Sequence, residues 1–120
     1  MNDYTSQILD YSQNPPNYGE LKNCNYTLTA KNPSCGDDLT IFLKVENKII
    51  TDASFLADGC AISKAAASML LEEIKGKPIS NLKLVNTNTV LNLLKIDISK
   101  TREKCAFLVL DALGNFTKDL

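Results

Sequence analysis

One stretch of the chain constrains the fold more than any other, because its pattern predicts two β-strands joined by a tight turn. From Leu39 to Glu46 apolar and polar residues alternate, which is the period of a strand with one buried face. Asn47-Lys48 supplies the turn, and residues 49–56 return as a second strand. Alternation over residues 26–30 predicts one more strand ahead of this hairpin. We therefore expect a small antiparallel sheet of three strands.

The rest of the chain favours helices. Residues 61–75 carry apolar side chains at helical spacing, and Gly76 followed by Pro78 is typical of a helix end. Residues 79–97 predict one or two short helices, and a last helix is expected over residues 100–118. The expected anchors are Ile62, Ala66, Met69, Ile74, Leu91, Leu94, Ala106, Val109, Leu113 and Phe116. Strands followed by helices predict an α+β fold, with the three-stranded antiparallel sheet packed against C-terminal helices.

The length of 120 residues predicts a single domain that spans residues 1–120. A short helix is expected over residues 4–12, and the tandem prolines Pro15-Pro16 end it. Chain termini are often poorly anchored, so we expect residues 1–20 to be loosely held.

Composition and charge argue against several classes of partner. The net charge is −1 and no run of like charge occurs, so nucleic-acid binding is not expected. No apolar stretch approaches the ~18–20 residues that span a bilayer, so we expect no membrane partner. The N-terminus lacks the basic-then-apolar pattern of a secretory signal. We expect a cytoplasmic protein whose thiols stay reduced.

Histidine is absent from the chain. Its absence excludes Ser-His-Asp triads, Cys-His nucleophile pairs and metal sites with histidine ligands. Thiolate and carboxylate chemistry remain.

Three cysteines have local settings that favour a metal site. Cys35 lies in a polar loop, and Cys60 lies at the expected start of a helix, where free N–H groups stabilise a thiolate. Because a hairpin returns its ends to one edge, Cys35 and Cys60 should lie near each other. Cys105 falls in the early turns of the last helix. With the carboxylate of Asp37 as a fourth ligand, the three thiolates would form a site for zinc or an iron–sulfur cluster.

Other interpretations of the cysteines stay open at this point. Their even number admits a disulfide framework, although the chain shows no export signal and is not cysteine-dense. Cys105, on an apolar helix, also fits a buried core cysteine. Cys24 lies between two asparagines without an acidic or glycine neighbour, and we interpret it as incidental.

The motifs around these cysteines resemble those of the IscU/SufU/NifU N-terminal family of iron–sulfur cluster assembly proteins. They are Asn32-Pro33-Ser34-Cys35-Gly36-Asp37, then Ile50-Thr51-Asp52-Ala53-Ser54-Phe55 with Gly59-Cys60-Ala61-Ile62-Ser63, and Lys104-Cys105-Ala106. The opening Ile8-Leu9-Asp10-Tyr11 with Asn14-Pro15-Pro16-Asn17-Tyr18-Gly19 is also similar. The resemblance covers nearly the whole chain and implies a SufE/NifU-like fold.

The resemblance implies a role in iron–sulfur cluster assembly, with two mechanisms open. In the first, the chain accepts persulfide sulfur from a PLP-dependent cysteine desulfurase, at a metal site of Cys35, Asp37, Cys60 and Cys105. Cys35 is then the sulfur acceptor. In the second, the chain is a non-enzymatic scaffold on which a [2Fe–2S] cluster is assembled and transferred to apo iron–sulfur proteins or carriers. Zn²⁺ or the cluster would occupy the same residues, whose completeness argues against a degenerate member that merely binds zinc.

Two features of the sequence point to different branches of the family. Lys104 stands where the scaffold branch usually has histidine, which resembles the SufU branch. Cys60 and Cys105 are nevertheless only 45 positions apart, which is close to the scaffold branch. A lysine ammonium beside a sulfur can stabilise a thiolate or persulfide. With Lys100 and Arg102, Lys104 forms either a basic strip for an acidic partner or a solvated helix face.

Overall fold

The computed structural model describes residues 6–32, 36–95 and 98–117. Its elements are α1 (Ser6–Gln13), β1 (Tyr26–Asn32), β2 (Asp37–Glu46), β3 (Ile49–Asp58), α2 (Ala61–Ile74), the 3₁₀ helix η1 (Ile79–Leu84), α3 (Thr87–Leu94), α4 (Lys100–Ala106) and α5 (Leu108–Thr117). The prediction of an α+β fold with a three-stranded antiparallel sheet is confirmed. No helix in the described ranges is long and apolar enough to cross a membrane.

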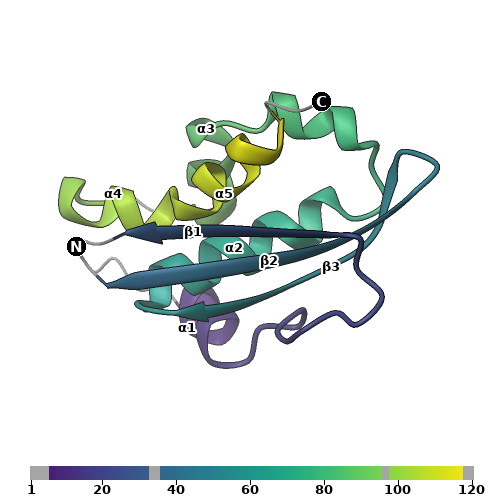
Figure 1. The fold of residues 1–120 in the computed structure, drawn as a ribbon. Coiled ribbons are helices and arrows are strands. Elements are labelled where there is room, and N and C mark those ends of the chain that lie inside the picture. The colour runs from purple at the N-terminus through teal and green to yellow at the C-terminus, as the bar shows by residue number, and fades with distance from the viewer. Residues whose placement is uncertain (1–5, 33–35, 96–97, 118–120) are drawn as a thin grey trace.

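The sheet has the order β1-β2-β3, and its helices lie on one face (Figure 1). Asn47 and Lys48 have positive φ angles of 53° and 65°, which suit the two-residue turn of a tight hairpin. The register pairs Asp38 with Asp58 at the other end of the hairpin. The end of β3 therefore lies beside the start of β2, and the segment that leads to Cys60 leaves the sheet there.

Helix α2 is the centre of the molecule. It packs against β3 and against helices α1, α3, α4 and α5 (Figure 1). The predicted anchors Ile62, Ala66, Met69 and Ile74 are buried, and so is most of the remaining helix surface. Periodicity predicted one buried face, whereas neighbours on several sides bury nearly all of this helix. Such enclosure fixes the position of the helix start, where Cys60 lies.

The predicted single helix over residues 100–118 is wrong. The structure has two helices, α4 and α5, and the chain turns at Phe107, whose φ and ψ are −95° and 4°. The Phe107 carbonyl accepts the first hydrogen bond of α5, from Leu110 N at 3.0 Å. The turn lets α4 bury Cys105 and Ala106 while α5 packs along β1.

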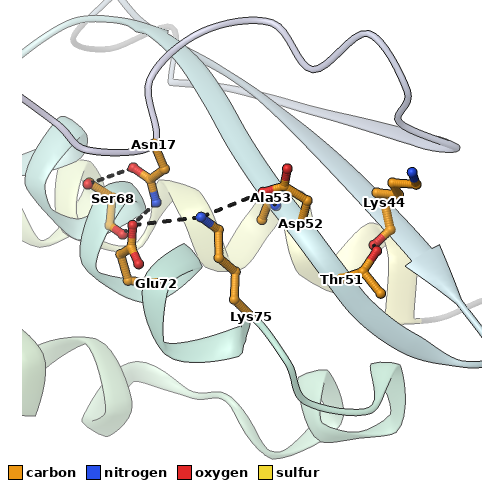
Figure 2. Close-up of polar contacts among 8 residues, drawn as sticks. All are labelled: Asn17, Lys44, Thr51, Asp52, Ala53, Ser68, Glu72 and Lys75. Atoms are coloured by element: carbon orange, nitrogen blue, oxygen red, sulfur yellow. Dashed lines mark hydrogen bonds and ion pairs between the residues drawn. The ribbon is translucent and has the colours of Figure 1, made fainter.

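The segment ahead of the sheet is tied to α2 by buried contacts. Ile8 of α1 is fully buried. Asn17 Nδ2 donates to the Ser68 carbonyl at 3.1 Å, and Ser68 Oγ donates to Asn17 Oδ1 at 2.8 Å (Figure 2). Figure 2 also shows Lys75, at the end of α2, in ion pairs with Asp52 and Glu72. The expected looseness of residues 1–20 concerns mobility and stays a prediction.

Replacing Ile8 by alanine measures how firmly α1 is held. We expect Ile8→Ala to lower the free energy of unfolding by about 2–4 kcal/mol, because it leaves a cavity between α1 and α2. Leu9→Ala is the matched control, since Leu9 is 39% exposed, and about 0.5 kcal/mol is expected for it. Urea denaturation gives both values. Equal, small effects of the two substitutions would show that α1 is only loosely attached.

Candidate metal centre

Asp37 is the first residue of β2, and its carboxylate is buried. Its Oδ1 accepts a hydrogen bond from Cys60 N at 3.2 Å. Its Oδ2 is also buried and has no hydrogen-bond partner in the structure. A buried carboxylate oxygen without a donor is costly, and a bound cation would remove that cost. This unsatisfied atom is the clearest structural sign of a cation site in the described part of the chain.

Gly59 allows Asp37 to occupy this position. Its φ of +156° is one that residues with a side chain rarely adopt. A Cβ atom on Gly59 would overlap Oδ1 of Asp37. The glycine therefore leaves the space that the carboxylate fills. Sequence reasoning missed this packing, because it depends on the register of two strands rather than on local spacing.

Cys60 is the N-cap residue of α2, which confirms the predicted helix start. Its side chain is half-buried. The Cys60 carbonyl accepts a hydrogen bond from Ser63 Oγ at 2.9 Å, and Cys60 Sγ lies 3.9 Å from Ser63 Oγ. Ser63 was not expected to contribute to the site. A serine three residues after the helix start was the available signal, since serine hydroxyls can donate to the backbone carbonyl three or four residues earlier.

Cys105 comes from the last turn of α4 and is buried. Burial raises the pKa of the Cys105 thiol, and the neighbouring side chains of Asp37 and Cys60 raise it further. The thiol therefore keeps its proton in the metal-free protein at neutral pH. A metal that binds Cys105 must displace this proton, so its affinity should increase as the pH rises.

These three side chains meet at one end of the sheet. The ligand atoms of Asp37, Cys60 and Cys105 all lie within 4.8 Å of one another. They come from β2, α2 and α4, which are far apart in the sequence. Two thiols and a carboxylate are ligands that suit zinc or iron. The group therefore fits a metal site.

The other two cysteines are not part of the described group. Cys35 lies outside the described residues, so its expected proximity to Cys60 stays a prediction. Cys24 lies just before the start of β1, at the opposite end of that strand from Asn32, which pairs with Asp37. Its Sγ is 3.7 Å from Thr27 Oγ1, and it is not part of the group.

The expected basic strip is a hollow with charges of both signs. Lys100 and Lys104 line a space of about 380 Å³ beside α4, and Arg102 does not line it. The other lining residues are Lys31, Asn32, Glu103, Phe107 and Asp111. Because two carboxylates share the space with three ammonium groups, the surface beside the site is mixed rather than uniformly basic.

The structure is thus a small α+β domain that gathers two thiols and a carboxylate at one end of its sheet, in a group that fits a metal site. The model of the NifU-like N-terminal domain matches residues 3–119. This protein belongs to the family of NifU-like N-terminal domains. The resemblance found in the cysteine motifs is confirmed.

Named relatives and solved structures agree with this assignment. Iron-sulfur cluster assembly scaffold protein IscU 1 of Archaeoglobus fulgidus is 36% identical over 110 residues, which cover 92% of this chain and 71% of that protein. The zinc-dependent sulfurtransferase SufU of Bacillus subtilis is 42% identical over 76 residues, which cover 63% of this chain and 51% of that protein. The crystal structure of a putative scaffold protein for the SUF system from Fervidobacterium islandicum has a TM-score of 0.79 and 28% identity, and covers 94% of this chain and 95% of its own.

Replacing Gly59 by alanine tests the packing under Asp37. If Asp37 is a ligand, we expect Gly59→Ala to lower zinc affinity about 10–100-fold, because the new methyl group displaces the Asp37 carboxylate. Competition with a chromophoric chelator measures the affinity.

Gly76→Ala is the matched control for this substitution. Gly76 has a φ of +82° and open space at its Cβ position, so alanine there would strain the backbone without filling any space at the site. We expect Gly76→Ala to lower stability and to leave zinc affinity unchanged. Equal zinc affinity in wild type and Gly59→Ala would contradict the packing role.

Proposed function

We propose that this protein acts in iron–sulfur cluster assembly by accepting persulfide sulfur from a PLP-dependent cysteine desulfurase. The proposed metal site consists of Cys35, Asp37, Cys60 and Cys105. The observation that carries the proposal is the convergence of Asp37, Cys60 and Cys105 within 4.8 Å, with one buried carboxylate oxygen left without a hydrogen bond. A cytoplasmic location, where thiols stay reduced, suits such a site.

The donor set has the composition expected for zinc. Three thiolates and one carboxylate would give the four ligands of a tetrahedral site. Bound zinc would supply a positive charge that keeps the cysteines deprotonated at neutral pH. Asp37 would be the hardest and most readily displaced of the four ligands.

The family resemblance of its motif supports Cys35 as the sulfur acceptor. Of the other two cysteines of the proposed site, Cys105 is buried and Cys60 is half-buried at a helix start. In the proposed transfer, the Cys35 thiolate attacks the outer sulfur of the desulfurase persulfide. A new S–S bond forms at Cys35, the old S–S bond breaks, and the desulfurase cysteine leaves as a thiolate.

Two features favour sulfur acceptance as the first candidate. A relative that is 42% identical over 76 residues is named a zinc-dependent sulfurtransferase. Lys104 precedes Cys105 in α4 and is exposed, and an ammonium that reaches the site would stabilise an anionic persulfide.

A cluster scaffold is the second candidate. The IscU 1 relative, which is named a scaffold protein, matches over 92% of this chain. Cys35, Asp37, Cys60 and Cys105 would then hold a [2Fe–2S] cluster as cargo for apo iron–sulfur proteins or carriers. Asp37 would bind the cluster through oxygen, which is harder and more easily displaced than sulfur. This ligand would therefore help release of the cluster to an acceptor.

Mass spectrometry after incubation with a cysteine desulfurase and cysteine, without oxygen, tests the first candidate. We expect the peptide that contains Cys35 to gain the mass of one sulfur atom. Cys35→Ser should abolish the gain, and Cys24→Ser should retain it, because Cys24 is not part of the metal group.

The same incubation with ferrous iron distinguishes the second candidate. A [2Fe–2S] absorption spectrum that an apo-ferredoxin can take over, without a persulfide on Cys35, would replace sulfur acceptance by the scaffold role. If neither sulfur nor iron is taken up, both candidates are wrong.

A further inference from the structure

The last residues of β3 lie at an open edge of the sheet and lead directly to the metal centre. β3 is the outer strand in the order β1-β2-β3, so its backbone groups on one side have no strand partner. The segment Asn17-Tyr18-Gly19, called here the strap, covers this edge. Gly19 N donates to the Phe55 carbonyl at 2.8 Å, and Phe55 N donates to the Asn17 carbonyl at 3.1 Å.

The hydroxyl of Tyr18 occupies the next backbone position on this edge. It donates to the Ala57 carbonyl at 3.2 Å and accepts from Ala57 N at 3.4 Å. The Tyr18 ring packs edge-on against Phe55, with 5.2 Å between ring centroids. Tyr18 is 46% exposed, so burial alone does not account for its position. One hydroxyl thus satisfies both backbone groups of Ala57, three residues before Cys60.

The end of β3 needs such support, because its cross-strand pair is electrostatically unfavourable. Asp58 lies directly opposite Asp38, and like charges in that position weaken strand pairing. Lys31 is 3.7 Å from Asp38, but both side chains are mostly exposed and their ion pair is weak. The strand end therefore depends on contacts from outside the hairpin.

The strap also holds the helix that begins at Cys60. Asn17 and Ser68 form two buried hydrogen bonds, and Ser68 lies in the middle of α2 (Figure 2). The strap thus holds both the strand before Gly59 and the helix after it. Gly59 must stay against the Asp37 carboxylate, and Cys60 N must reach Asp37 Oδ1, for the site to keep its geometry.

We propose that Tyr18 is a positioning residue for the metal centre, and that its hydroxyl holds the end of β3 so that Gly59 and Cys60 stay against Asp37. The part of the proposal that concerns the end of β3 rests on the hydrogen bonds of Tyr18 to Ala57 described above. The consequence for metal binding rests on the proposed function. Tyr18 acts through the backbone of Ala57 and touches no ligand atom.

Amide hydrogen exchange in the metal-free protein tests the part that concerns the end of β3. We expect Tyr18→Phe, which keeps the ring, to speed exchange at the amides of Ala57 and Cys60 by roughly fivefold or more, as for loss of one hydrogen bond. Exchange at Ile50, at the far end of β3, should not change. Tyr26→Phe is the matched control, because its ring packs on Phe116 at the opposite end of β1. Equal exchange at Cys60 in the two variants would overturn the proposal.

Cobalt(II) titration tests the consequence for the site. We expect Tyr18→Phe to weaken Co²⁺ binding about tenfold and to shift the cobalt absorption bands, with no change in Tyr26→Phe. Unchanged affinity and bands in Tyr18→Phe would overturn the positioning role. If the wild type binds no Co²⁺, the proposed function fails, and amide exchange still decides whether Tyr18 holds the strand.

A second substitution keeps the proposal testable if Tyr18→Phe folds poorly. Asp58→Asn removes the like-charge pair with Asp38, so it should restore slow exchange at Cys60 in the double variant Tyr18→Phe with Asp58→Asn. If exchange at Cys60 is as fast in the double variant as in Tyr18→Phe, repulsion between Asp38 and Asp58 is not what the Tyr18 hydroxyl opposes, and that part of the proposal is overturned.

Discussion

The contact between the buried carboxylate of Asp37 and the backbone of Gly59 and Cys60 is the constraint on which the site depends. One carboxylate oxygen accepts from Cys60 N, and the other has no partner. A fold that buries a carboxylate in this way loses stability unless a cation or donor compensates. Such a local cost is typical of functional sites, where consistent packing elsewhere maintains an unfavourable arrangement.

Each layer of the fold contributes to holding that contact. The hairpin register sets the start of β2 beside the end of β3, and the surrounded helix α2 fixes Cys60. Helix α4 brings Cys105 to the same point because the chain turns at Phe107, which frees α4 to follow α2 while α5 follows β1. The group of Asp37, Cys60 and Cys105 is thus a product of tertiary packing, although each member lies in a short sequence motif.

Sequence patterns predicted the elements with strong local signals. Alternation in β2 and the Asn47-Lys48 turn defined the hairpin, and the Gly76 stop placed the end of α2 within one residue of its position. The break at Phe107 was missed, because helical spacing continues across it and only packing against two different elements separates α4 from α5.

At the site, the sequence predicted Asp37, Cys60 and Cys105, and the structure brings them together. Gly59 and Tyr18 were not predicted in their roles, because a missing Cβ and a hydroxyl bond to a distant backbone leave no periodic signal.

X-ray absorption at the zinc edge of the purified, zinc-loaded protein tests the central claim most directly. We expect three sulfur ligands at about 2.3 Å and one oxygen ligand at about 2.0–2.2 Å. A shell of nitrogen and oxygen without sulfur, or a protein that retains no zinc, would contradict the account.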